Sequence, residues 1–425
     1  MKRFIIAGGI LAGIVIALLI NSRLKYQREL EEVKKVVEKA LDTGDTEDMG
    51  KAGKALEKNM EYGFPLIVEA AEGGNATRRC NAIKLLGIVE PFIANDTRDK
   101  TIDLLMKSFD GGGDDVRREA IRVITTEYEH KDCAGKLREI IKSQTNGEFD
   151  PAAIAAMEGL GNIAQEGDVE LIGDFLRHRN DILRMGATRG VRNTATVNAL
   201  KMLLDILPSE KNLMVRISAV TFAGDLGGVL RGKGADDETI KALADLLKNE
   251  KALTLMVQNS EAALYRKQFI ELFDFEMPNQ EMGEKYALEK FFFFKLLVAL
   301  YHWNRGEMFT VLRERILDAS GSERDVLEEA GSSYVEFLLK NTLDVPYREG
   351  RTPSVRLQVK KKNSGWLLDI ARLLVPMLNT DSGGFALENL KRITGEDHEK
   401  DKSEWRELIE RYDSEPDSFT PGGQS

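Results

Sequence analysis

Side chains that could catalyse a reaction or bind a metal are few and scattered in this sequence. His130 and Cys133 form an isolated His-x-x-Cys pair, which supplies only part of the ligand set of a structural zinc site. The other histidines, His178, His302 and His398, fall in no metal-binding or general-base motif. We therefore expect no metal and no cofactor, and we expect that the protein is not an enzyme.

Two further patterns also argue against catalysis. The glycine run Gly111–Gly113 lacks the Lys-Ser/Thr pair of a phosphate-binding loop, and no nucleophile elbow occurs. Cys80 and Cys133 could form a disulfide in an oxidising compartment, but two small, unpaired core residues are the favoured interpretation.

Positively charged side chains gather in two places and are the candidate partner-binding residues. They are Arg177, Arg179, Arg184, Arg189 and Arg192 in one stretch, and Arg348, Arg351, Arg356, Lys360, Lys361 and Lys362 in an irregular segment. The second group could dock an acidic partner or anionic headgroups, and the first could line the concave surface of a helical stack. The alternatives, favoured in an acidic protein, are ion pairs with neighbouring units for the first group and a solvated loop for the second.

Composition sets limits on the class of protein. The chain has 425 residues, of which 42% are hydrophobic and 31% charged, so it is neither disordered nor small. Two cysteines exclude a disulfide scaffold. With 60 basic and 70 acidic residues the net charge is −10, which disfavours a nucleic-acid-binding protein.

An apolar run opens the chain. Residues 4–20 are uninterrupted apolar or small residues after the short basic N-terminus 1–3. As a helix the run would span about 26 Å, close to the lower limit for crossing a bilayer. A cleaved signal peptide is the alternative, although no convincing cleavage site follows. We predict a single-pass transmembrane anchor or uncleaved signal.

The charges around this run leave its orientation open. Lys2 and Arg3 favour a cytoplasmic N-terminus and an exported, periplasmic body, whereas Arg23, Lys25 and Arg28 argue the reverse.

Small residues within the run suggest a contact between two copies. Gly9, Gly13 and Ala17 lie four residues apart on one helix face, which could pack a homodimer through the membrane helix. The alternative is that glycine and alanine are simply common in membrane helices.

A repeated pattern organises the residues that follow. An arginine precedes an alanine by three positions inside an apolar helical pattern, and the alanines recur roughly every 31–38 residues. The four pairs are Arg79/Ala82, Arg117/Ala120, Arg184/Ala187 and Arg216/Ala219, and a fifth segment, Ala153–Ala156, lacks the arginine. This period predicts helical hairpins stacked side by side, with alanine allowing close approach.

These segments resemble the HEAT-repeat family. Asp115–Ala120 is the nearest copy of its motif, Val215–Ala219 and Gly159–Gly161 are partial copies, and the resemblance covers about residues 75–250. It implies an all-α fold, an α-solenoid of stacked antiparallel helix pairs (HEAT-like), here with an N-terminal transmembrane helix, as in a membrane-anchored bacterial HEAT-repeat protein. It implies little about function.

The C-terminal region resembles a closing unit of bacterial HEAT-repeat proteins. A Leu-Lys-Arg-Ile-Thr-Gly turn ends at Gly395 and precedes a helix with Trp405, Leu408 and Ile409, which would cover the end of the stack.

The expected organisation follows from these patterns. Residues 21–48 are expected to form a charged helical stalk and hinge, or alternatively to begin the first packed helix. The apolar run Phe291–Tyr301 could be buried, or partly exposed as a binding groove. The remaining segments are HEAT-like repeats over 49–250, diverged helical repeats over 251–380 with a basic loop at 344–362, a capping unit over 381–413 and a disordered tail over 414–425.

The function expected from the sequence is a membrane-tethered scaffold or adaptor that binds a protein partner. A lyase-like helical-repeat enzyme is the alternative, and a nucleic-acid-binding solenoid that uses Arg177–Arg192 is a third.

Overall fold

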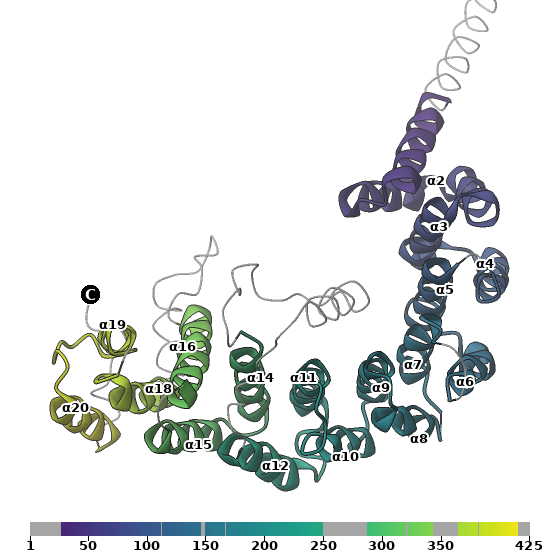
Figure 1. Ribbon diagram of the computed structural model, residues 1–425. Helices are drawn as coiled ribbons and strands as arrows, with labels where there is room; N and C mark the ends of the chain where they lie inside the picture. Colours follow the sequence, from purple (N-terminus) through teal and green to yellow (C-terminus); the bar gives the residue numbers. More distant parts are fainter. Residues whose placement is uncertain are drawn as a thin grey trace, which may run out of the picture. The chain divides into compact units, whose positions relative to one another are not determined.

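The computed structural model is all-helical in the residues that it describes (Figure 1). These are residues 27–111, 113–145, 149–165, 167–249, 287–319, 322–342, 364–380 and 382–414. The chain divides into two compact units, Met1–Ile172 and Gly173–Ser425. The predicted anchor at 4–20, the basic loop at 344–362 and the tail beyond residue 414 lie outside the described residues.

In unit 1 the helices pack in the order of the sequence. Helices α3, α5 and α7 are successive neighbours in one layer, and α2, α4 and α6 each pack against a helix of that layer (Figure 1). After a helix over residues 27–43, the elements are α2 (Thr46–Gly73), α3 (Ala76–Val89), η1 (Glu90–Phe92), α4 (Asn95–Ser108), α5 (Asp114–Thr126), η2 (Lys131–Cys133), α6 (Ala134–Ser143), α7 (Ala152–Asn162) and α8 (Asp168–Gly173).

Small residues set the spacing between the helices of that layer. Ala82, Ala120 and Ala156 are fully buried, as the repeat pattern predicts. A Cβ atom on Gly159 of α7 would lie only 2.9 Å from the Thr125 hydroxyl oxygen of α5. Since no larger side chain fits there, glycine and alanine let neighbouring helices approach closely. The predicted all-α fold of sequential helix pairs is confirmed.

The helix over 27–43 is packed against the body of unit 1 instead of forming a free stalk. Val37 and Leu41 are fully buried, and Asn81 of α3 donates its amide N–H to the Leu41 carbonyl at 3.0 Å. Arg78 forms ion pairs with Glu38 and Asp42. Of the two interpretations of this stretch, the structure therefore favours the first packed helix.

Unit 2 repeats the two-layer arrangement. Helices α9, α11, α14 and α16 are successive neighbours in one layer, and α10, α12 and α15 lie in the other (Figure 1). Its elements are η3 (Asp174–Arg177), α9 (Asp181–Asn193), α10 (Val197–Ile206), α11 (Leu213–Leu230), α12 (Asp236–Asn249), α14 (Ala287–Trp303), α15 (Arg305–Asp318), α16 (Ser322–Thr342), α18 (Ser364–Met377), α19 (Gly383–Thr394) and α20 (Lys402–Ser414).

The phenylalanine run forms part of the core of unit 2. Phe292 and Phe293 of α14 are almost fully buried, and the Arg216 guanidinium carbon lies 4.6 Å from the Phe292 ring centroid. The Trp303 indole donates to the Ala223 carbonyl of α11 at 2.9 Å. These contacts favour the buried interpretation of this run over the binding groove.

One helix of the described residues, Leu213–Leu230 (α11), is long and apolar enough to cross a membrane. Its most apolar window is 72% buried inside the protein, against α9, α10 and α14. Packing of this kind is typical of a core helix.

The last two described helices, α19 and α20, pack on α18 at the C-terminal end of unit 2. Gly395 ends α19 in the left-handed conformation (φ +78°) that glycine adopts without strain. Trp405 of α20 is fully buried and donates its indole N–H to the Glu399 carbonyl at 2.9 Å, while Leu408 and Ile409 pack beside it. The opposite side of α20 is charged and exposed.

Candidate protein-binding surface

Two of the repeated arginines hold successive helix pairs together. In unit 1, Arg117 donates two hydrogen bonds to the Asp150 carboxylate, at 3.0 and 2.9 Å, and a third to the Phe109 carbonyl at 2.9 Å. Asp150 also accepts from the Ala152 backbone N–H at the start of α7. The arginine thereby ties the turn before its own helix to the beginning of the next helix in the layer.

Arg184 makes the same kind of connection in unit 2. Its guanidinium binds Glu210 in a bidentate fashion, at 2.6 and 2.9 Å, and donates to the His178 carbonyl at 2.8 Å. Glu210 in turn accepts from the Asn212 backbone N–H, and Asn212 caps α11. The side chain of Arg184 is only 14% exposed, so this candidate belongs to the framework and not to a binding surface.

The other arginines of this stretch occupy two different places. Arg177 ends η3 and Arg179 lies in the turn that follows, and both are exposed. Arg189 and Arg192 lie three residues apart near the C-terminal end of α9, where Arg189 is half-buried and Arg192 is exposed. The structure therefore does not bring the five predicted residues together in one cluster.

The remaining candidates lie outside the described residues. They are Arg348, Arg351, Arg356, Lys360, Lys361 and Lys362 of the basic loop and Gly9, Gly13 and Ala17 of the apolar run.

Arg192 belongs to a charged cluster that spans three neighbouring helices. Its guanidinium lies 3.3 Å from the Asp225 carboxylate of α11, and both side chains are more than 40% exposed. Lys295 of α14 is half-buried, and burial lowers the pKa of its ammonium group. Asp225 opposes this shift by favouring the charged form. One carboxylate on the central helix thus interacts with cations from the helices on both sides.

Apolar side chains of α11 accompany this cluster. Val229 lies one helical turn beyond Asp225, and its side chain is 51% exposed. Phe222 lies one turn before Asp225, with its ring centroid 5.9 Å from the Arg192 guanidinium carbon. An exposed arginine and an exposed aliphatic side chain beside a half-buried aromatic ring, on adjacent helices, are typical of protein-binding surfaces. We call this surface the α11 face; it comprises Arg189, Arg192, Phe222, Asp225, Val229 and Lys295.

The His-x-x-Cys pair does not form a metal site. The Cys133 thiol donates to the His130 carbonyl at 2.9 Å, and burial raises the pKa of the thiol to about 12. Cys80 and Cys133 are both free thiols. Within the part of the chain that the structure describes, no group of histidine, cysteine and acidic side chains could hold a metal ion.

No family model matches the sequence. No curated protein matches it either. Among solved structures, an engineered protein from the Northeast Structural Genomics Consortium covers 84% of this chain and 98% of its own length, with 17% identity and a TM-score of 0.32. A second engineered protein from that consortium covers 57% of this chain and 96% of its own, with 17% identity and a TM-score of 0.26. Superpositions with such low scores do not define a shared topology, so the fold rests on the helix pairs within each unit.

Proposed function

We propose that this chain is a membrane-tethered, HEAT-like scaffold that binds a protein partner through the α11 face and catalyses no reaction. The observation that carries the proposal is the exposed Arg192–Asp225 pair between two adjacent helices of one layer, with Val229 exposed one helical turn beyond Asp225. Layers of parallel helices offer extended surfaces on which neighbouring units contribute side chains to one contact.

The nature of the exposed groups supports a protein partner. Charge, aromatic surface and an exposed aliphatic side chain occur within two helical turns of α11. A protein partner can match such a mixed surface with complementary charges and an apolar contact.

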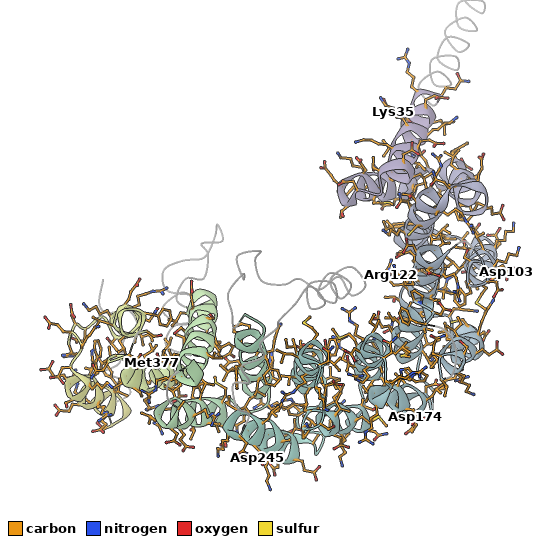
Figure 2. All side chains as sticks on the ribbon, in the orientation of Figure 1. Lys35, Asp103, Arg122, Asp174, Asp245 and Met377 are labelled. Carbon is orange, nitrogen blue, oxygen red and sulfur yellow. The ribbon has the colours of Figure 1, made fainter. Side chains whose placement is uncertain are left out.

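Photocrosslinking in membranes tests the binding function. A photoreactive amino acid at position 229 should give one adduct of defined mass with a partner protein, because this position is exposed within the α11 face. The matched control is position 245 on α12, which is exposed in the other layer of the same unit (Figure 2). Equal adducts at both positions, or no adduct at 229 in folded protein, would contradict the proposed function.

The membrane tether is tested by the fate of the N-terminal run. We expect full-length chain in the membrane fraction after alkaline extraction, with a mature mass that includes residues 4–20, because such a run partitions into the hydrocarbon core. A reporter fused to the C-terminus then gives the side of the membrane. A soluble chain that begins after this run would rule out the tether.

A further inference from the structure

Two neighbouring turns of unit 2 are tied to each other through Arg184. One turn joins η3 to α9, and the other joins α10 to α11. Arg184 donates to the His178 carbonyl at 2.8 Å and to the Arg179 carbonyl at 3.4 Å, both in the first turn. The same guanidinium binds the Glu210 carboxylate of the second turn at 2.6 and 2.9 Å. The two turns therefore lie side by side in a fixed arrangement.

Three exposed cations on these turns have no ion pair and no side-chain hydrogen bond in the described part of the chain. We call them the turn cations; they are Arg177, Arg179 and Lys211. The carboxylates of Asp181 and Glu210, which lie at the ends of the same turns, already bind Arg184 at 2.7 and 2.6 Å. These two acids are therefore not available to neutralise the turn cations.

The surroundings of the turn cations are positively charged overall. Residues 174–184 and 208–212 hold four cations and three carboxylates, in a protein whose net charge is −10. The third carboxylate, Asp174 at the start of η3, is exposed and forms no ion pair with the described residues. Burial lowers the pKa of His178, and the charges of Arg179 and Arg184 lower it further. The positive charge at this turn thus acts on a neighbouring group and would favour an incoming anion.

The first turn is also held in shape by His178. Its ring stacks on the Phe175 ring, with the centroids 5.6 Å apart, and its Nδ1 atom accepts from the Asn180 backbone N–H at 3.1 Å. Because the backbone that carries Arg177 and Arg179 is already ordered, a ligand that binds there has little backbone entropy to remove.

We propose that the turn cations form a second docking surface, which binds an acidic segment of a protein. Carboxylates of that segment bind the guanidinium groups of Arg177 and Arg179, and Lys211 binds a further acidic side chain. The turn cations lie at the N-terminal ends of α9 and α11, whereas the α11 face lies toward the C-terminal ends of these helices. The inference therefore goes beyond the proposed function and does not depend on the α11 face.

The surroundings favour a protein segment over a membrane surface or a nucleic acid. The large exposed apolar side chains of the described part of unit 2 are Val229 and Leu317, so none lies on these turns to insert into a bilayer. The exposed Asp174 carboxylate repels a dense row of phosphates, whereas a protein segment can place its carboxylates only where the cations lie.

Fluorescence polarisation with the full chain in detergent tests the proposal. The probe is a fluorescein-labelled peptide of alternating Glu and Gly, and the control peptide carries Gln in place of Glu. We expect preference for the Glu peptide. Replacing Arg177 and Arg179 together with Gln should weaken its binding by roughly threefold to tenfold, and Lys211→Gln should weaken it by roughly twofold. Because these side chains are exposed and unpaired in the described part of the chain, the circular dichroism of the variants should be unchanged.

A matched control removes two cations elsewhere in the same unit. Lys241 and Lys248 of α12 are exposed and form no ion pair with the described residues, so replacing both with Gln should leave peptide binding unchanged. Equal binding of the two peptides overturns the proposal, as does a control variant that weakens binding as much as the arginine variant. Tighter binding to anionic vesicles or to duplex DNA than to the Glu peptide also overturns it.

This proposal and the proposed function can fail separately. The adduct at position 229 reports on the α11 face, whereas the peptide assay reports on the turn cations. Loss of the adduct would leave an acidic segment as the ligand of the turn cations, and loss of peptide preference would leave the α11 face as the protein-binding surface.

Discussion

Replacing Arg184 with alanine should lower the free energy of unfolding of unit 2 by about 3 kcal/mol. The substitution leaves the Glu210 carboxylate, whose side chain is 5% exposed, without its bidentate partner. It also removes the donor to the His178 carbonyl. Urea denaturation of the full chain, followed by circular dichroism, measures the loss.

The matched control lies on the same helix. Arg192→Ala removes an ion pair that is exposed on both sides, so we expect a loss of less than about 1 kcal/mol. Arg184→Lys should recover only part of the loss at position 184, because an ammonium group cannot reproduce the two parallel hydrogen bonds. If the two alanine variants unfold at the same urea concentration, Arg184 does not hold the framework together.

Replacing Gly224 with alanine should destabilise unit 2 by about 1–3 kcal/mol, although alanine is the better helix former. A Cβ atom at this position would lie 2.8 Å from the Ala299 Cα atom and 3.0 Å from its Cβ atom. Because the obstacle is the backbone of α14, the two helices must move apart, and the burial of Trp303 against α11 is disturbed.

A second glycine of the same helix provides the control. Gly228 is exposed, and a Cβ atom there would meet nothing within 4 Å. Gly228→Ala should therefore stabilise the protein by up to about 1 kcal/mol through helix propensity alone. Thermal unfolding of the two variants should shift in opposite directions, and a shift in the same direction would contradict close packing of α11 on α14.

The recurring features of the fold could be predicted from the sequence because they are local. The arginine and alanine of each motif lie on one helix, and their spacing already indicates which side is buried. Ala82 and Ala120 are buried as expected, and Trp405 covers the end of unit 2. Asp150 accepts from the Ala152 backbone N–H, a contact that an aspartate just before a helix commonly makes.

The α11 face could not be predicted in this way. Arg192, Asp225 and Lys295 come from three helices, so no spacing within one helix relates them. The sequence showed a basic stretch from Arg177 to Arg192, but it did not show that Arg184 is bound by Glu210. Opposite charges that meet across a turn become visible only when the packing of the helices is known.

The boundary between the units was also not apparent from the sequence. It falls after Ile172, inside the region expected to form continuous repeats. The short helix α8 runs there directly into the 3₁₀ turn η3. A helix of this length carries too few apolar residues for its periodicity to stand out.

The arginine connections have a consequence for shortening or recombining this chain. In these two connections the acidic partner comes later in the sequence, just before the next helix of the layer: Asp150 for Arg117 and Glu210 for Arg184. A truncation that ends just after α5 therefore keeps the Arg117 guanidinium and removes the Asp150 carboxylate that binds it. Fragments of this chain should end after the acidic residue and not after the helix that carries the arginine, so that each fragment keeps both members of the ion pair.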